Sequence, residues 1–154
     1  MKTVFKALRF GLLVGLLGVG LLPASSYALG YSTATKAAIV NAIAGQVGNT
    51  GVLVFYSGTQ PATCGTETTR LVTFTLRSPF APTTSTATLN ITVPAVATVT
   101  TAGTATWFRV STNTGTCVFD GTLGISGADI NLVSTTFFAG LSVGLSSWSI
   151  TSGN

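Results

Sequence analysis

The chain has 154 residues, of which 46% are hydrophobic and only 6% are charged, with a net charge of +4 and no histidine. The length suits one domain, and this balance excludes an intrinsically disordered chain, which combines low hydrophobicity with high charge. Because so few side chains can transfer a proton, ligate a metal or activate a nucleophile, the sequence predicts a binding or structural protein without catalytic residues, cofactor or metal.

The positive charge does not indicate a nucleic-acid partner. Three of the seven basic residues, Lys2, Lys6 and Arg9, lie in the first nine positions. The rest of the chain has four basic and three acidic residues, and therefore a net charge of +1. Four scattered basic residues do not form the stripe that follows a phosphate backbone, so we expect no nucleic-acid binding.

Residues 1–28 follow the layout of a secretory signal peptide. A basic opening precedes the apolar run 10–22, which is too short to span a bilayer comfortably. The small residues Ser26 and Ala28 stand at the two positions that signal peptidase requires, so we expect cleavage between Ala28 and Leu29 and export to the periplasm, the cell surface or the medium. The alternative is an uncleaved hydrophobic helix that serves as an anchor or an assembly contact.

Residues 29–154 are expected to form a single domain that opens with a helix at 35–47. Ser32 or Thr33 can cap the start of this helix, and Gly48 is a suitable stop. The apolar residues at helical spacing are expected to share one face: Ile39, Val40, Ile43 and Val47.

Beyond the helix, apolar residues recur with period two and turn residues follow every few positions. This pattern is typical of antiparallel strands, and it predicts a mainly β fold, an antiparallel β-sandwich of jelly-roll or immunoglobulin-like type with seven or eight strands. Asp120-Gly121 is read as the tight turn of a hairpin. The strands are expected at residues 52–56, 70–76, 86–93, 105–110, 116–120, 128–133 and 147–151, with an eighth in the weaker stretch 96–101.

The two cysteines, Cys64 and Cys117, are expected to form a disulfide, because thiols usually pair in an oxidising compartment. Two thiolates without a histidine or a nearby acid cluster do not complete a zinc site. The alternative is two unpaired buried thiols.

The remaining polar and aromatic residues are expected to have structural roles. Asp120 and Asp129 are read as backbone-bonding residues of a turn and a loop rather than as a catalytic pair. No Gly-x-Ser-x-Gly motif occurs, and Lys36 is a poor candidate for a Ser-Lys dyad. Arg109 is expected to stack on Trp107. Four aromatic residues form either a sugar-stacking platform or part of the core, and core packing is favoured: Tyr56, Trp107, Phe108 and Trp148.

The order of short motifs resembles a family of small structural proteins of tailed phages and prophages. The resemblance covers most of residues 31–154. It rests on a helix followed by LVFYSGTQPAT at 53–63, ATWFR at 105–109, FDG at 119–121, GADINL at 127–132 and SITSGN at 149–154. It implies a virion component at the head surface, neck or tail. This chain differs from the pattern in its leader and its cysteine pair.

We therefore expect a non-enzymatic structural subunit of a phage-like particle, such as a capsid decoration, neck or tail protein. Its partners would be copies of itself and other virion proteins, which pack against threonine-covered strand faces that carry few ions. Loops such as 58–66 can contact a carbohydrate or a receptor. The alternative is an exported surface or filament subunit or adhesin, with contact to a membrane only through an uncleaved leader. The end of the chain lacks the penultimate aromatic residue of chaperone-assembled pilins.

Overall fold

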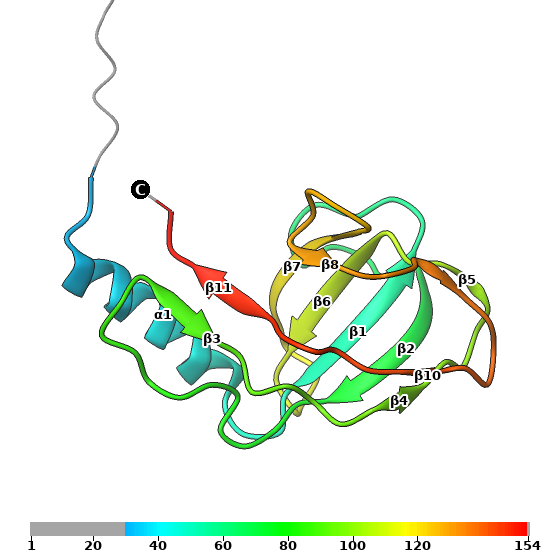
Figure 1. Cartoon of the computed structure of the whole chain (residues 1–154), viewed down its shortest axis with the longest axis horizontal. Coiled ribbons are helices and arrows are strands. Elements are labelled where there is room, and N and C mark those ends of the chain that lie inside the picture. Colours follow the sequence, from blue (N-terminus) through cyan, green and yellow to red (C-terminus); the bar gives the residue numbers. More distant parts are fainter. Residues whose placement is uncertain (1–29, 154) are drawn as a thin grey trace, which may run out of the picture.

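The structure is a computed structural model that describes residues 30–153 of the chain. The described part is mainly β, with one helix and a curled five-stranded sheet (Figure 1). The expected signal-peptide cleavage between Ala28 and Leu29 falls outside the described residues and stays a prediction.

Helix α1 spans Thr33–Val47, close to the expected 35–47. The Ser32 hydroxyl accepts a hydrogen bond from the Thr35 backbone N–H at 3.2 Å, which caps the start of the helix. Gly48 ends it with a φ of 67°, a value that favours glycine. The buried side is narrower than expected: it contains Ala37, Val40 and Val47, whereas Ile39 is exposed.

The main sheet has the strand order β2-β1-β6-β7-β8. All neighbours in it are antiparallel except β7 and β8, which run parallel, so the expectation of a purely antiparallel sheet was wrong. The Asp129 carboxylate accepts from both the backbone N–H and the hydroxyl of Thr122, and this clamp brings the returning chain alongside β7 in the same direction. The strands are β1 Val52–Ser57, β2 Thr69–Thr75, β6 Trp107–Ser111, β7 Cys117–Gly124 and β8 Ile130–Asn131.

Asp120 and Gly121 lie inside β7, so the prediction of a hairpin turn at this dipeptide was wrong. They pair with Arg109 and Phe108 on β6. A Cβ atom at position 121 would lie 2.5 Å from the Phe108 ring, so glycine is required here for close packing and not for a turn. The hairpin turn lies at residues 112–116 instead, where the first backbone N–H donates to the last carbonyl at 2.8 Å.

Six short strands form three antiparallel pairs beside the main sheet: β3 Thr88–Asn90 with β11 Ser149–Thr151, β4 Ala97–Thr98 with β10 Ser142–Val143, and β5 Gly103–Thr104 with β9 Thr136–Phe137. They are shorter than most of the expected strands in these regions, because the backbone changes partner within a few residues. The N–H of Ile91 donates to Trp148, and the next N–H, of Thr92, donates to Phe80. A regular ladder therefore ends after Asn90.

One large hydrophobic core lies between one face of the main sheet and these short pairs. Alternating residues of β1 and β2, such as Phe55 and Phe74, contribute to it, and their ring centroids lie 5.1 Å apart. Leu89, Val99 and Phe137 contribute from the short pairs, and Val40 from the helix joins the same core. In Figure 1, α1, β3 and β11 gather at one end of the molecule.

A second, smaller cluster lies on the opposite face of the main sheet. It consists of Val54, Tyr56 and Trp107, with Val52 packed against it. Because strand side chains alternate, Arg109 on β6 shares this face with Trp107. We call this face the outer face, and it carries the polar network described next.

Candidate functional site

The outer face is built around an aromatic stack between neighbouring strands. Tyr56 on β1 pairs in register with Trp107 on β6, and their rings stack with centroids 4.2 Å apart and an interplanar angle of 10°. The Trp107 indole N–H donates to the Thr68 hydroxyl at 3.0 Å. This bond attaches the end of the 58–68 loop to the sheet.

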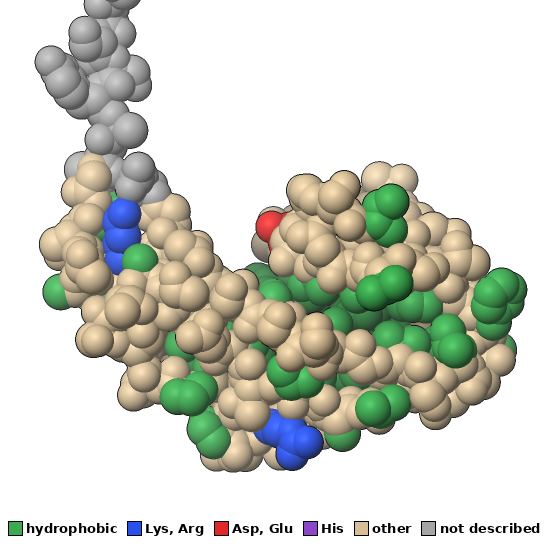
Figure 2. All heavy atoms as spheres, viewed as in Figure 1, with side chains coloured by type: hydrophobic (Ala, Val, Ile, Leu, Met, Phe, Trp, Pro, Cys, Tyr) green, Lys and Arg blue, Asp and Glu red, His purple; other side chains and the backbone are tan. Residues whose placement is uncertain are grey.

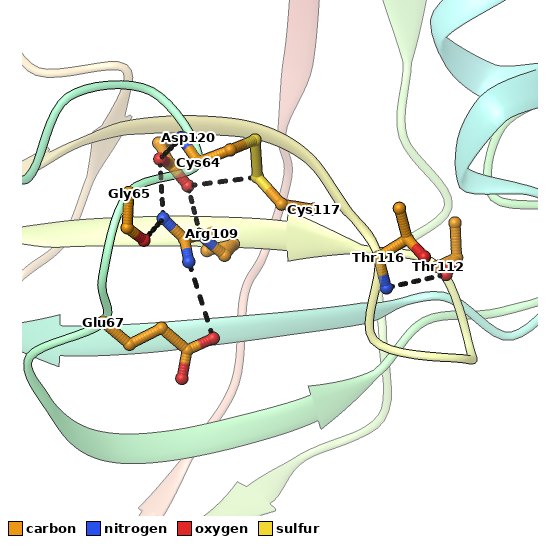
Figure 3. The surroundings of a disulfide bond; sticks show 8 residues. All are labelled: Cys64, Gly65, Glu67, Arg109, Thr112, Thr116, Cys117 and Asp120. Carbon is orange, nitrogen blue, oxygen red and sulfur yellow. Dashed lines mark hydrogen bonds and ion pairs between the residues drawn. A yellow bond between two sulfur atoms is a disulfide. The ribbon is translucent and has the colours of Figure 1, made fainter.

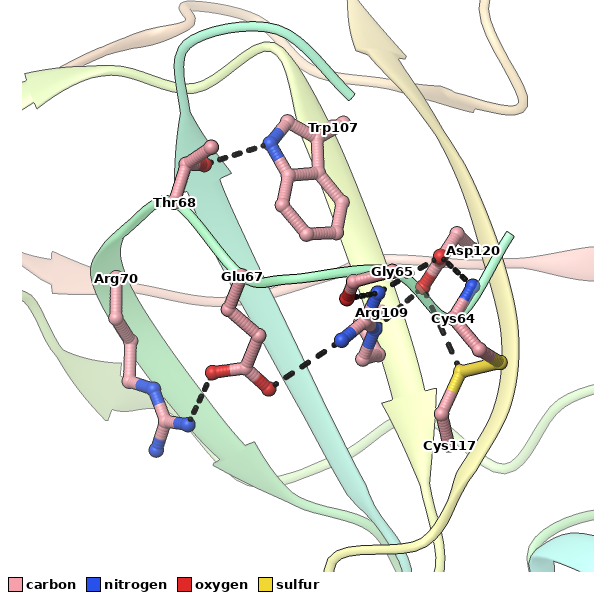
Figure 4. A network of polar contacts seen from close by, with 9 residues as sticks. All are labelled: Cys64, Gly65, Glu67, Thr68, Arg70, Trp107, Arg109, Cys117 and Asp120. Atoms are coloured by element: carbon pink, nitrogen blue, oxygen red, sulfur yellow. Dashed lines mark hydrogen bonds and ion pairs between the residues drawn. A yellow bond between two sulfur atoms is a disulfide. The ribbon is translucent and has the colours of Figure 1, made fainter. Parts of the chain in front are cut away.

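Arg109 is the centre of a polar network beside this stack (Figure 4). Its Nε donates to Asp120 Oδ1 at 2.6 Å and its Nη2 to Asp120 Oδ2 at 3.0 Å, a two-point ion pair across β6 and β7. The same Nη2 donates to the Gly65 carbonyl at 2.9 Å, and Glu67 lies 3.6 Å from Nη1. The guanidinium also lies over the Trp107 ring, 5.4 Å from its centroid, as expected from the sequence. The pair is almost fully buried, with side-chain exposures of 6% and 0%.

The disulfide expected between Cys64 and Cys117 is present beside this ion pair (Figure 3), with an S–S distance of 2.01 Å. It joins the 58–68 loop to the first residue of β7. The Cys64 backbone N–H donates to Asp120 Oδ2 at 2.7 Å, so one carboxylate binds both the arginine and the loop. The backbone of Cys64 has a φ of 58°, a conformation that residues other than glycine rarely adopt. The covalent bond and the hydrogen bonds together hold the loop in this conformation.

Glu67 extends the network to the surface. Its carboxylate accepts from Arg70 at 2.9 Å (Figure 4). Burial opposes ionisation of Glu67, but the hydrogen bond from Arg70 and the charges of Arg70 and Arg109 outweigh it and lower the pKa of this carboxyl group. The Tyr56 hydroxyl is buried and has no hydrogen-bond partner among residues 30–153. Burial and the neighbouring Glu67 carboxylate raise the pKa of Tyr56 to about 12.

The chemistry of this network is that of a structural clamp. The Arg109 guanidinium already binds Asp120, Gly65 and Glu67, so it does not offer a free pair of N–H donors to an anionic ligand. Cys64, Cys117 and Asp120 place their ligand atoms within 4.8 Å of one another, but disulfide sulfurs are not thiolates and do not provide strong metal ligands. The arrangement holds the 58–68 loop against the outer face, and we call it the loop clamp.

The structure divides the four aromatic residues that the sequence grouped into two pairs, on opposite faces of the main sheet. Tyr56 and Trp107 are buried in the outer-face cluster and Phe108 in the main core, so a joint sugar-stacking platform was wrong and core packing was right for these three. Trp148 is partly buried and packs against the main core, with its ring centroid 5.5 Å from that of Phe108. The carboxylates of Asp120 and Asp129 bind different partners, Arg109 in one case and Thr122 in the other.

The Arg109–Asp120 ion pair was not predicted from the sequence. Both residues lie on expected strands. A charged side chain on a buried strand requires a partner, so these positions could have indicated an ion pair. Reading Asp120-Gly121 as a turn hid this pairing.

Comparison of the chain with family models, with curated proteins and with solved structures finds no match. The phage-protein resemblance therefore stays a prediction. Among residues 30–153, no helix has the length and hydrophobicity that a membrane span requires.

Proposed function

We propose that this protein is a non-enzymatic structural subunit of a phage-like virion, a capsid decoration, neck or tail component, which acts by packing against copies of itself or a lattice. The assignment to a virion rests on the order of sequence motifs. The assembly function rests on one structural observation, three exposed apolar side chains beside β4 and β10.

The three exposed apolar side chains beside the β4–β10 pair are Val96, Phe138 and Leu141. Val96 precedes β4, and Phe138 and Leu141 bracket the turn that leads into β10, which pairs with β4. Their exposed fractions are 68%, 67% and 44%, whereas large apolar side chains are normally withdrawn from water. We call these three residues the β4–β10 patch.

The described surface around this patch carries few charged side chains. Residues 30–153 contain seven charged side chains, and the Arg109–Asp120 pair among them is buried. The view in Figure 2 shows a surface dominated by uncharged side chains, with scattered hydrophobic groups and very few charges. Packing such a surface against a neighbour removes apolar area from water and requires little desolvation of ions.

The proposal includes a more specific fold. We infer that the main sheet and the three short strand pairs form the two layers of a curled β-sandwich. The shared core supports this inference, because Phe55 and Phe74 of the sheet pack in one cluster with Val99 and Phe137 of the short pairs. An experimental structure of the protein in its assembled state would test this arrangement.

The assembly function is tested by sedimentation velocity over a range of protein concentrations. We expect the native protein to associate and the double variant Phe138→Ser/Leu141→Ser to sediment as a monomer. The matched control is Ile125→Ser, which removes an equally exposed apolar side chain, at 70%, from the loop after β7. A native protein that stays monomeric at every concentration would overturn the proposal, as would equal loss of association in the control.

The alternative is an exported surface or filament subunit, and the disulfide favours it. Disulfides persist in oxidising compartments and are rare in cytosol. Intact mass of the native protein separates the two functions. A chain that starts at Leu29 and has lost two hydrogens supports export, whereas a chain that starts at Met1 with free thiols supports assembly in the cytosol.

A further inference from the structure

An open cleft of about 430 Å³ lies between the β7–β8 end of the main sheet and the C-terminal segment. Figure 2 shows this face hollowed between these two parts of the molecule. The volume falls within the range of small-molecule sites, roughly 300–1,000 Å³. The cleft is lined by Asn90, Asp129, Ile130, Asn131, Ser147, Trp148 and Ser149. It is separate from both the loop clamp and the β4–β10 patch.

Internal hydrogen bonds use only part of the polar capacity of this lining. Asp129 Oδ2 accepts two bonds from Thr122, both at 2.8 Å, and Asn131 Oδ1 accepts from the Ala128 backbone N–H at 3.1 Å. These bonds fix the orientation of both side chains. They leave Oδ1 of Asp129 as an acceptor, and the amide group of Asn131 as a donor, with no partner in the described part of the chain.

Three further polar side chains of the lining form no hydrogen bond with other residues of the described chain. Asn90, Ser147 and Ser149 make no side-chain hydrogen bond within residues 30–153, although Asn90 and Ser149 are held in place as a backbone pair of β3 and β11. An amide offers both donors and an acceptor, and a hydroxyl offers both as well. The cleft therefore presents donors and acceptors together, on and beside the strands β3, β8 and β11.

Trp148 provides the apolar part of the cleft. Its ring is fixed by edge contacts with Phe108 and Phe80, whose centroids lie 5.5 Å and 6.1 Å away. It is partly exposed, and its indole N–H has no acceptor among the described residues, unlike that of Trp107, which donates to Thr68. A fixed indole next to uncommitted amides and hydroxyls is suited to a ligand with both an apolar face and polar edges.

We propose that this cleft binds a neutral saccharide. Vicinal hydroxyl groups both donate and accept, which matches the Asp129 carboxylate oxygen together with the amides of Asn90 and Asn131. The C–H face of a pyranose ring matches the Trp148 indole. The lining contains one carboxylate and no cation, which disfavours an anionic ligand. This site goes beyond the assembly function and does not depend on it.

The test uses the two indole N–H signals of the ¹⁵N-labelled protein in an NMR titration. The probes are glucose, galactose, N-acetylglucosamine and their β1,4-linked disaccharides, each added to about 20 mM, well above the millimolar Kd of a weak site. We expect the Trp148 signal to shift in a saturable way with at least one of these sugars. The Trp107 signal serves as an internal control and should stay in place.

Two variants with similar exposure separate binding from folding. Asn90→Ala removes an amide of the cleft that makes no internal hydrogen bond, and we expect it to weaken saccharide binding at least tenfold. Asn49→Ala removes an exposed asparagine outside the cleft lining and should leave binding unchanged. Backbone spectra that superimpose on the native spectrum confirm that each variant folds.

Three outcomes would overturn the proposal. In the first, no sugar of this panel shifts the Trp148 signal. In the second, the two alanine variants lose binding equally. In the third, glucosamine shifts the signal while glucose and N-acetylglucosamine do not, which would assign the cleft to an ammonium group attracted by Asp129.

Discussion

At the scale of single residues, Asp120 joins β6, β7 and the 58–68 loop. Its carboxylate binds the guanidinium of Arg109 at two points and the backbone N–H of Cys64, and its side chain is fully buried. Buried charges are costly unless each has a partner. Removing one partner is therefore more harmful than removing both.

We expect Asp120→Ala to lower the free energy of unfolding by about 3–5 kcal/mol, because it removes the two-point partner of the buried Arg109 and leaves only Glu67, 3.6 Å from Nη1, and the Gly65 carbonyl. The double variant Arg109→Met/Asp120→Leu should recover much of this loss, since it leaves no unpaired charge. Urea unfolding of the three proteins measures both effects. A single variant within 1 kcal/mol of the native protein would contradict the importance of the pair.

Tyr56 gives a prediction for alkaline pH. Its pKa is raised from 10.0 to about 12, so between these values the unfolded phenol ionises while the folded one keeps its proton. The native state then binds more protons, and stability contributed by this group is present below pH 10 and lost as pH rises towards about 12.

Ultraviolet difference absorbance should therefore show one tyrosine that titrates with a pKa of about 12. Tyr56→Phe, which keeps the ring and its stacking on Trp107, should lack this late step and lose less stability over the same interval. A native protein in which every tyrosine titrates near the ordinary value of 10.0 would contradict the burial of Tyr56.

At the scale of elements, α1 is attached to the β structure by few contacts, and Asn41 supplies a specific one. Its side chain makes a reciprocal pair with Thr84: the amide donates to the Thr84 carbonyl at 2.8 Å, and its oxygen accepts from the Thr84 N–H at 3.0 Å. In the loop before β3, Thr84 thus depends on the helix for both of its backbone hydrogen bonds.

Asn41→Ala should reduce stability by about 1–3 kcal/mol, because it leaves two partly buried backbone groups unpaired. Hydrogen exchange at the Thr84 amide should accelerate more than exchange in β1. The control is Gln46→Ala, on the same helix but exposed, for which we expect little change. Uniform acceleration across the whole protein would indicate global unfolding instead of local release.

Sequence patterns predicted the helix and the first two strands well, ended β7 too early at Asp120, and predicted the short strands poorly. Helix α1 and strands β1 and β2 lie where cap residues and the alternation of apolar positions placed them. The short pairs were misjudged because their lengths depend on which distant segment accepts each backbone N–H, as at Ile91 and Thr92. Local propensity does not contain this information.

Of the candidate sites, the disulfide could be predicted from the sequence, whereas the ion pair and the cleft could not. The cysteine pairing followed from the count of thiols and the expected compartment. The ion pair of Arg109 required the register of β6 and β7, and the cleft beside Trp148 required the position of β11 next to β3. Both depend on contacts between residues far apart in the chain, which a single sequence does not reveal.

At the scale of the whole molecule, the disulfide joins two cysteines with a sequence separation of 53, and the enclosed segment includes β2 and β6, the neighbours of β1. Loop-closure entropy assigns about 4 kcal/mol of stabilisation to a bridge of this separation, acting mainly on the unfolded chain. The double variant Cys64→Ser/Cys117→Ser should lower the free energy of unfolding by up to this amount.

Denaturant unfolding with and without reductant measures this effect, and the variant should be insensitive to the reductant. Its NMR spectrum should still show the Trp107 indole bonded to Thr68, because hydrogen bonds from Arg109 continue to hold the loop. If the 58–68 loop lost its structure, the polar part of the loop clamp would be weaker than its contacts indicate.

The surface carries little charge, so the proposed assembly contacts should respond little to dissolved salt. Screening by dissolved ions weakens attraction between charges but leaves contact between apolar groups intact, and sulfate strengthens it. Contacts made through Phe138 and Leu141 should therefore persist from fresh water to brine and tighten on mild warming. A particle coated with this protein would keep its subunits through changes of salinity that dissociate assemblies held by ion pairs.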